Sequence, residues 1–496
     1  MGFKTGIITL LILLVQSINA QEVKGVVVDK TTKKSIPFAT ISAHNSYAIA
    51  NEQGQFKLSP KPYNTNDSVT VQVMGYLDLK LPIKMLGDSI FMEPNPIALN
   101  EVVLVNNQYQ PEDLIEKVKA SFEKNYSYNL ERKSIFLRES TYDSIEDFQM
   151  NLLKSTYSEI NEELIDELKA SMPTKSNFFV ETLFDFYGTP QESKNKIEVI
   201  KGSVLRDENN TVDSDIIERK MGLLLQKKTS LGSYFKLKSG IFSAKLETDD
   251  FTLETKSDSV KPTVKTESQL QKERKTYARN RARIIERFSN ELFYNEDSFI
   301  DVFDKSQRYE FEIIDLKLRG EEFIYTLSFA PKRRSGFKGK IMINAADAAV
   351  EMISYENTSN LKSFSLFGFK FKDYLALGTQ VFRKNIHGTY DLVFLQESRG
   401  NLASIQRPLK LIEKRKTGSW KRKQNEVSFE FNIRLSNIET KEYMLIDKSP
   451  ISRSEYDNFK PIYKVNKVRL NAFDPHFWDG YSILEPNDLL REFKIQ

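Results

Sequence analysis

Strict alternation of apolar and polar residues constrains this chain more than any other feature of its sequence. The alternation is clearest in EVSFEFNIRL, residues 426–435. The apolar set is Val427, Phe429, Phe431, Ile433 and Leu435, and the polar set is Ser428, Glu430, Asn432 and Arg434. Successive side chains of a β-strand point to opposite faces, whereas a helix would scatter this pattern around its axis. The stretch therefore predicts a strand with one apolar face.

The same alternation recurs through the C-terminal half of the chain. RYEFEII (308–314) and EFIYTLSF (322–329) alternate on either side of Gly320, and GKIMIN (339–344) and AVEMISYEN (349–357) follow. Antiparallel strands with one apolar face need a covering layer, which we expect helices to supply. The predicted fold class is mainly β with some α: an N-terminal seven-stranded β-sandwich plus a larger antiparallel β-rich α+β domain.

The N-terminal twenty residues have the pattern of an export signal. MGFKTGIITLLILLVQSINA places Lys4 before a short apolar run and ends on the small residue Ala20. About ten apolar residues suit a signal peptide and are too few to span a bilayer. We predict that residues 1–20 are a signal peptide. The alternative is a buried N-terminal helix.

The chain contains no cysteine, so an exported form has no disulfides and carries no lipid on a cysteine. At 496 residues it is too long for one ordinary core. Its 72 Lys and Arg against 68 Asp and Glu leave a formal charge of +4, which favours no polyanionic partner. We therefore expect no nucleic-acid binding.

Residues 22–90 read as short strands joined by turns. DSVTVQVMGY (67–76) alternates Val69, Val71 and Val73 with polar residues. In NEQGQF (51–56) a glycine can adopt positive φ, so that Phe56 enters the next strand facing the core. Gly75 before Tyr76 suggests a bulge or a close backbone approach. Together these patterns predict a small β-sandwich.

This order of motifs resembles the carboxypeptidase-like regulatory domain. The matching residues are GVVVD (25–29), IPFATI (36–41), NEQGQFKL (51–58) and VMGY (73–76), with ALNEVVL (98–104) as the segment that follows the domain in envelope proteins of Bacteroidota. The resemblance implies a seven-stranded, transthyretin-like sandwich over residues 21–104. It implies an accessory module and no peptidase activity. Ala50 and Asn51 replace the usual Thr-Asp, and asparagine still tolerates the turn.

The rest of the chain divides into a short connection and a β-rich domain. Residues 105–133 are predicted to hold a linker and one amphipathic helix that starts at Pro111. Residues 134–496 are predicted to form the β-rich domain, with helices near 153–172 and 277–294 and a polar linker or insertion near 247–275. The segment LIEKVKASFEKNYSYNLERKSIFLRES (114–140) resembles Bacteroidota proteins of unassigned function.

One further stretch suggests how the large domain is built. FKGKIMINAADAAVEMISYEN (337–357) resembles the strand-turn-strand of lipoprotein-carrier-like half-barrels. That resemblance implies a curved antiparallel sheet that holds an acyl chain against a helix.

Catalytic and metal-binding motifs are scarce. The three histidines, His44, His387 and His476, are far apart and have no HExxH or HxH spacing. No G-x-S-x-G elbow and no glycine-rich nucleotide-binding loop is present. The sequence therefore predicts no catalytic residue, no metal site and no cofactor.

The most concentrated polar and aromatic cluster is NAFDPHFWDGYSILEP, residues 471–486. It contains Asp474, His476, Trp478, Asp479 and Tyr481. One reading is a ligand-contacting loop with His476 as an acid or base. We favour the other reading, in which Phe477 and Trp478 anchor a C-terminal segment to the sheet.

Two basic clusters occur, over residues 272–287 and 414–424. The first is interpreted as the solvated face of a helix, and the second as a solvated turn near Trp420. The alternative for the second cluster is contact with anionic lipid headgroups.

We therefore interpret the chain as an exported, non-enzymatic protein of the cell envelope, periplasmic or peripherally associated with the outer membrane. It is expected to bind a lipid, a glycan or a protein partner. Two alternatives stay open: a hydrolase acting on glycan or peptide, and a small outer-membrane β-barrel that follows the sandwich.

Overall fold

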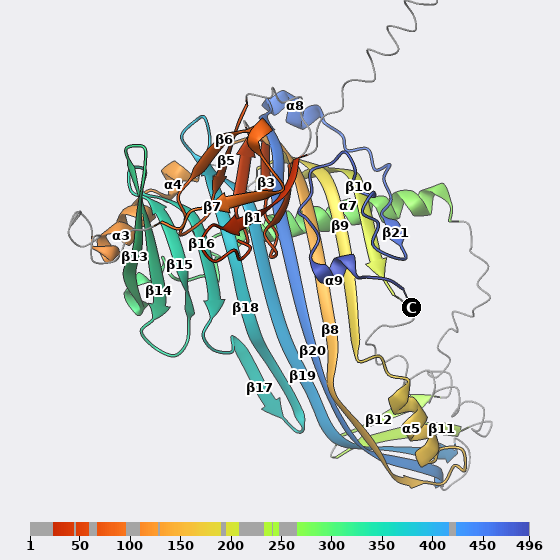
Figure 1. Ribbon diagram of the computed structural model, residues 1–496. Coiled ribbons are helices and arrows are strands. Elements are labelled where there is room, and N and C mark those ends of the chain that lie inside the picture. Colours follow the sequence, from red (N-terminus) through yellow and green to blue (C-terminus); the bar gives the residue numbers. More distant parts are fainter. Residues whose placement is uncertain are drawn as a thin grey trace, which may run out of the picture.

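The computed structural model describes residues 23–43, 46–58, 67–95, 110–126, 129–189, 195–207, 233–240, 242–247, 265–415 and 423–495. The predicted signal peptide, His44 and Trp420 lie outside these residues. The described chain forms a small sandwich, residues 23–95, and a large sheet to which the sandwich is docked (Figure 1).

The sandwich consists of a three-stranded sheet, in the order β4-β1-β7, and a four-stranded sheet, in the order β3-β2-β5-β6. Its strands are β1 (Val23–Asp29), β2 (Thr40–Ala43), β3 (Ser46–Ile49), β4 (Gln55–Leu58), β5 (Ser68–Gln72), β6 (Leu79–Pro82) and β7 (Ser89–Met92), with a 3-10 turn η1 at Ile83–Met85. Val27, Phe56 and Ile90 from the first sheet pack against Ile41, Val69 and Val71 from the second. The predicted seven-stranded sandwich is confirmed.

Gly54 shows why the NEQGQF turn needs a glycine. Its φ is +74°, and a Cβ atom there would lie 2.8 Å from the Val27 carbonyl oxygen. The turn delivers Phe56 into the core, where it is buried. Gly75, at φ +82°, makes a turn before Tyr76, which bridges to Pro94 and donates its hydroxyl to Asp29 at 2.7 Å.

The large sheet has fourteen described strands in the order β13-β14-β15-β16-β18-β19-β20-β8-β9-β10-β21, with β11, β12 and β17 attached at its sides. The strands that begin the sheet are β8 (Glu131–Ser155), β9 (Lys175–Gly188), β10 (Lys196–Arg206), β11 (Ser233–Ser239) and β12 (Phe242–Glu247). The strands that complete it are β13 (Tyr309–Arg319), β14 (Glu322–Pro331), β15 (Phe337–Asn344), β16 (Ala349–Asn357), β17 (Lys362–Leu366), β18 (Phe369–Lys384), β19 (Tyr390–Arg415), β20 (Lys423–Pro450) and β21 (Val468–Leu470).

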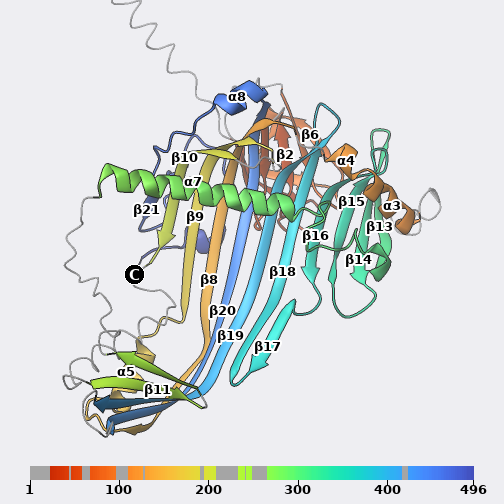
Figure 2. The same cartoon turned by 180° about the vertical axis from the view of Figure 1, so that it is seen from behind.

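The sandwich and the long helix α7 (Glu267–Asn290) lie on opposite faces of this sheet, as Figures 1 and 2 show. α7 begins ten residues before the expected start at 277. Residues 267–275, expected in a polar linker, are its first turns, and residues 248–264 lie outside the described residues. A capping box between Thr266 and Gln269 starts the helix. Its N-terminal half packs few side chains into the core and is therefore polar, so its sequence resembles that of a linker.

Two shorter helical segments also differ from expectation in length. Residues 153–155 end β8, and only Glu162–Ala170 are helical, as α5, because the Asn161 side chain caps the helix there. The amphipathic helix that begins at Pro111 is confirmed as α3 (Pro111–Ala120), followed by the single turn α4 (Phe122–Asn125). The remaining short elements are η3 (Ser306–Arg308), α8 (Arg453–Asn458) and α9 (Asp488–Arg491).

The three longest strands, β8, β19 and β20, continue past the sandwich to a second small core at the far end of the molecule (Figure 1). There α5 and β11 pack on the sheet through Leu168, Phe235 and Val427. The predicted strand at 426–435 lies in β20, with Val427, Phe429 and Ile433 buried. No helix among the described residues combines the length and the apolar character needed to cross a bilayer.

Candidate functional site

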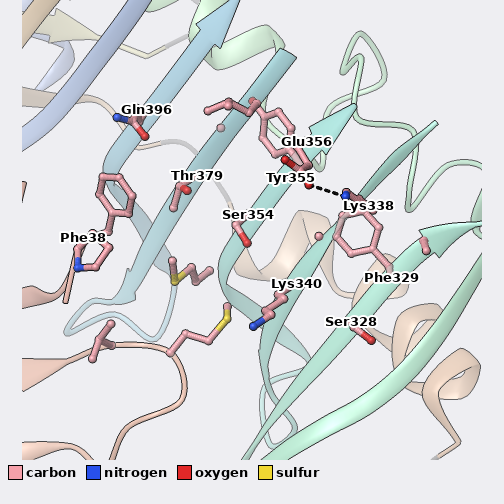
Figure 3. A pocket seen from close by; sticks show the side chains of 18 of the residues that line it. Phe38, Ser328, Phe329, Lys338, Lys340, Ser354, Tyr355, Glu356, Thr379 and Gln396 are labelled. Atoms are coloured by element: carbon pink, nitrogen blue, oxygen red, sulfur yellow. Dashed lines mark ion pairs between the residues drawn. The ribbon is translucent and has the colours of Figure 1, made fainter. Parts of the chain in front are cut away.

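A cleft of about 1010 Å³ separates the sandwich from the large sheet (Figure 3). One side is formed by residues 35–38, Val73, Met74 and Tyr76 of the sandwich, and the other by strands β13 to β16, β18 and β19. The cleft has two distinct parts, an apolar wall and a polar row. The apolar wall is Ile36, Pro37, Phe38, Val73 and Met74.

The polar row crosses six neighbouring strands of the cleft floor. Its residues, each paired in register with the next, are Glu312, Ser328, Lys340, Ser354, Thr379 and Gln396. Since strand neighbours lie about 4.8 Å apart, five steps make a row about 24 Å long. Thr379 and Gln396 are buried, and the Gln396 amide donates to Glu52 of the sandwich at 3.3 Å. The accessible part of the floor therefore offers hydroxyl, ammonium and carboxylate groups at regular intervals.

A second row runs beside the first and adds charge. Lys338 and Glu356 face each other across β15 and β16 and form an ion pair at 2.8 Å, marked in Figure 3. Glu310 lines the same edge of the cleft. Both members of the ion pair are about half exposed, so the pair contributes little to stability and its charges face the solvent of the cleft.

Phe38, in the apolar wall, has an unusual backbone conformation. Its φ is +58°, in the left-handed region that bulky residues rarely adopt. Such a conformation costs about 1–3 kcal/mol and persists only where the surroundings enforce it. Here the Phe38 N–H donates to the Ala50 carbonyl at 3.0 Å, and the ring stacks on Phe394 of the large sheet at 5.6 Å. The strain holds an aromatic ring in the mouth of the cleft.

Polar contacts fix the sandwich to the sheet and so set the width of the cleft. Asp78 forms ion pairs with Lys317 and with Arg319, the latter at 2.7 Å. Further along, the Arg383 guanidinium donates to the Thr40 hydroxyl at 2.7 Å, and the Asn95 amide donates to Asp315 at 2.6 Å. These contacts make the two sides of the cleft one connected structure.

Electrostatics favour this docking at neutral pH. Burial by itself raises the pKa of the Asp78 carboxyl, but the charges of Lys317 and Arg319 outweigh it, so the pKa lies below the usual value. Asp78 is therefore ionised well below pH 7. Arg319 also donates to Glu351 at 2.6 Å, so one guanidinium links the sandwich carboxylate to a carboxylate of the sheet.

Behind β16 and β18, the opposite face of the sheet is filled. An aromatic cluster, consisting of Phe122, Tyr126, Phe293, Tyr294, Phe303 and Phe382, packs there with ring centroids 4.5–6.2 Å apart. Beside this aromatic cluster, a cavity between the middle of α7 and the sheet measures about 50 Å³. That is room for a water molecule or two. Two more open pockets, of about 430 and 320 Å³, lie at the two ends of α7, and their linings include the charged side chains Arg274, Lys467 and Arg399.

The structure places the residues of the C-terminal cluster away from the cleft. Trp478 is buried and donates its indole N–H to Glu181 at 2.7 Å, as the anchoring interpretation predicts. His476 contacts Asp479 at 3.0 Å, but its side chain is 83% exposed. His387 lies in the exposed turn between β18 and β19. These histidines do not converge with one another or with the cleft.

A buried charge network surrounds the Trp478 anchor. Arg138 forms an ion pair with Glu181 at 2.8 Å and approaches Glu442 at 3.5 Å. Burial raises the pKa of the Glu442 carboxyl to about 6, against the opposing charge of Arg138. Arg138 also donates to the Glu485 carbonyl at 3.1 Å, so this network ties the C-terminal segment to the sheet.

The two basic clusters also separate in space. The cluster at 272–287 lies on α7, where Arg281 is buried and pairs with Glu139, so it is not purely a solvated face as predicted. Residues 416–422 of the second cluster lie outside the described residues. Among the described residues, no three His, Asp or Glu side chains are grouped as a metal site.

Sequence reasoning missed the cleft residues. Each strand alone shows polar residues on alternate positions, which reads as a solvent-facing surface. The sequence did carry one indication: between residues 310 and 379, strands β13 to β16 and β18 each have small or charged polar residues at alternate positions. Only the sandwich, which covers that surface, turns it into a cleft.

Comparison with known proteins supports the interpretation of the N-terminal part. Residues 23–104 match the CarboxypepD_reg-like domain family, so the predicted resemblance is confirmed over about one sixth of the chain. A comparison with curated proteins finds no match.

Solved structures with a related arrangement are remote. A LolA superfamily protein from Nitrosomonas europaea has 9% identity and a TM-score of 0.15, with 70% of this chain and 97% of that one covered. A putative outer membrane lipoprotein-sorting protein domain from Vibrio parahaemolyticus has 8% identity, a TM-score of 0.19 and the same coverage. A putative membrane-associated protein of unknown function from Bacteroides fragilis has 7% identity and a TM-score of 0.13, over 86% of this chain and 97% of that one. At these TM-scores the likenesses carry no inference.

Proposed function

We propose that this chain is an exported envelope protein that binds an extended peptide segment of a partner protein in the cleft. The polar row of Glu312, Ser328, Lys340, Ser354, Thr379 and Gln396 is the observation that carries the proposal. Export rests on the pattern of residues 1–20, and the envelope location rests on the match of residues 23–104 to an accessory domain of such proteins.

The chemistry of the cleft favours a peptide over the other candidates. A peptide about seven residues long, fully extended, spans the 24 Å row. Its backbone groups can pair with Ser328 and Ser354, and its apolar side chains can contact the wall around Phe38. The charges of Lys340 and Glu312 at fixed positions suit side chains of both signs, which a neutral glycan lacks.

A hydrolase is the weaker reading of the same cleft. His476, which has the carboxylate partner Asp479, lies outside the cleft and in solvent. A buried pair of this kind would have favoured acid-base chemistry. We therefore propose that the cleft binds a peptide and does not hydrolyse it.

Selection of peptides on the mature protein tests the proposal. Random heptapeptides displayed on phage are selected on immobilised protein, and binding of the synthetic winners is measured by fluorescence anisotropy. Lys340→Glu and Ser354→Phe should each weaken binding at least tenfold by reversing a charge or filling the floor. Lys175→Glu, a matched change at an exposed position of β9 outside the cleft, should leave binding unchanged.

Two outcomes contradict the proposal. Peptides whose affinity does not change in the Lys340→Glu and Ser354→Phe variants bind elsewhere. Failure of any peptide to bind, together with saturable binding of a purified envelope glycan that Ser354→Phe abolishes, would assign the cleft to a glycan instead.

A further inference from the structure

A second feature of the molecule is unrelated to the cleft: a hairpin whose tip is covered with exposed apolar side chains. The tip hairpin, residues 362–372, has the sequence KSFSLFGFKFK and joins β17 to β18. Phe364, Leu366 and Phe367 are 56%, 59% and 56% exposed, and every residue of β17 is exposed. Large apolar side chains gathered in this way usually mark a contact surface.

The two faces of the hairpin differ in chemistry. Phe364 pairs with Phe371 and Leu366 with Phe369, which puts these four side chains on one face. The rings of Phe364 and Phe371 stack at 6.0 Å. Ser363 and Ser365 pair with Lys372 and Lys370 on the other face. The hairpin is therefore amphipathic, with an apolar face and a face of lysine and serine.

The turn places one more aromatic ring at the extreme end. Phe367 has φ +48° and Gly368 has φ +81°, a pair of left-handed residues typical of tight hairpin turns. A Cβ on Gly368 would lie 2.3 Å from the Gln406 carbonyl oxygen, so the turn sits tightly against β19. Phe367 therefore adopts a strained left-handed backbone conformation in which its ring is exposed to solvent.

The neighbouring hairpin widens the apolar surface. Phe242 at the start of β12 is 48% exposed and meets Phe367 edge to face at 5.7 Å. The Arg407 guanidinium lies over the rings of Phe242 and Phe369, at 4.9 and 5.2 Å from their centroids. Two hairpins distant in sequence therefore form one aromatic surface, with a buried arginine beneath it.

We propose that this surface binds the headgroup region of an anionic phospholipid membrane. The tip hairpin carries Lys362, Lys370 and Lys372, and the register partner of Lys362 is Asp373, so its charge is still net positive and complements anionic lipid. Aromatic and leucine side chains that enter the interface, flanked by lysines, are the chemistry of peripheral membrane binding. The lysines also disfavour the alternative occupant, a second copy paired along the edge of β17, because charged edge strands resist such pairing.

The site is independent of the proposed function. Ile405 of β19 pairs with Phe369 in the hairpin, while Gln396 of the same strand pairs with Thr379 in the cleft. The two positions are an odd number of residues apart in an uninterrupted stretch of β19, so the apolar face of the hairpin and the cleft lie on opposite faces of the sheet. In Figure 1 the hairpin also lies well below the sandwich.

Vesicle sedimentation tests the proposal with the full mature chain. The probes are vesicles of phosphatidylcholine alone and vesicles containing 30 mol% phosphatidylglycerol. Binding should be at least tenfold tighter to the anionic vesicles and should weaken with salt. The triple change Phe364→Ser, Leu366→Ser, Phe367→Asn should reduce it at least tenfold, and each of Lys362→Glu, Lys370→Glu and Lys372→Glu by about fivefold or more.

Control variants separate this site from general effects. Ile386 is 85% exposed in the turn at the other end of β18, and Ile386→Ser should not change binding. To measure how deeply the hairpin enters the membrane, the tryptophan fluorescence of the Phe367→Trp and Ile386→Trp variants is recorded in vesicles that contain brominated phosphatidylcholine. On adding vesicles, fluorescence of the Phe367→Trp variant should be quenched and shifted to the blue, and that of the Ile386→Trp variant should change no more than that of the unsubstituted protein.

Several results would overturn the proposal. These are equal binding to both vesicle types, no loss in the triple variant, or no quenching of Phe367→Trp. A dimer in sedimentation equilibrium that the triple variant abolishes, without vesicle binding, would assign the surface to a second copy. Peptide affinity in the cleft should be unchanged in the triple variant, so the failure of one proposal leaves the other intact.

Discussion

The two faces of the large sheet use the same strands for different purposes. On the α7 side of β16 and β18, Phe382 and its aromatic neighbours fill the space and leave a cavity of about 50 Å³. On the sandwich side, Ser354 and Thr379 of the same strands line a cleft of about 1010 Å³. Alternation along each strand supplies both surfaces at once.

The difference shows how one sheet can be closely packed on one face and keep a cleft on the other. A close-packed aromatic layer gains stability from every contact, so it has no room to exchange partners. A polar layer kept apart from its cover by docking contacts such as Asp78–Arg319 keeps groups such as Lys340 and Ser354 available for hydrogen bonding. Stability and binding are thus assigned to opposite faces.

Truncating a side chain of the aromatic cluster should have the largest effect on stability. Phe382 is fully buried and meets Tyr126 and Phe293 edge to face, each at 5.3 Å. Phe382→Ala should lower the free energy of unfolding by about 3–5 kcal/mol, since it leaves a cavity among rings. Chemical denaturation followed by circular dichroism measures this. A loss below about 1 kcal/mol would mean that the cluster is loosely packed.

Removing the Asp78 ion pairs that hold the sandwich on the sheet should lower the free energy of unfolding somewhat less. Asp78→Ala leaves Lys317 and Arg319 partly buried without their shared carboxylate, and should destabilise the protein by about 2–3 kcal/mol. The cleft should also open, since its wall loses an anchor. Small-angle scattering would record a larger radius of gyration, and peptide affinity should fall. Asp67→Ala, a change in the same sandwich, is the control.

The pH dependence of stability tests the buried charges on the sandwich side. The pKa of Glu442 is raised to about 6 in the folded state from 4.5, so the folded state binds its proton more tightly than the unfolded state. Its contribution is fully present below pH 4.5 and is lost as the pH rises through 6, in total about 2 kcal/mol. Glu442→Gln should flatten stability between pH 4.5 and 7 in urea titrations. An unchanged slope would assign the pH dependence to other groups.

Changes on the cleft floor should have the smallest effect on folding. Lys340→Ala and Ser354→Ala remove side chains that are exposed or half-exposed, and each should change stability by less than about 0.5 kcal/mol. Peptide binding should nevertheless weaken several-fold. A variant that loses stability and binding in parallel would show that the two faces are not separable as described.

Much of the fold could be predicted from local pattern. Val69, Val71 and Val73 lie in or directly after β5 and are buried as expected, and Pro111 starts α3. The helix ends were less predictable: α7 begins with a polar half that looks like a linker. Its start is set by the Thr266–Gln269 capping box, a signal carried by two residues among many similar ones.

The candidate site could hardly be predicted at all. Lys340 and Ser354 are close in sequence and share a hairpin, but Phe38 lines the same cleft from more than 250 residues away. Nothing in the alternation of β15 indicates that a sandwich covers it. The tip hairpin was readable as KSFSLFGFKFK, yet its exposure on both faces appears only when β17 is seen at an edge of the sheet.

The sequence by itself determined which residues form strands, which face of each strand is apolar, and where glycine permits a turn such as Gly54. Only the tertiary structure decided that β20 lies beside β8, pairing residues almost 300 positions apart, and which polar face a second unit covers. The reason is physical: alternation has the same period in every amphipathic strand. It therefore specifies a surface for burial but not the partner that buries it.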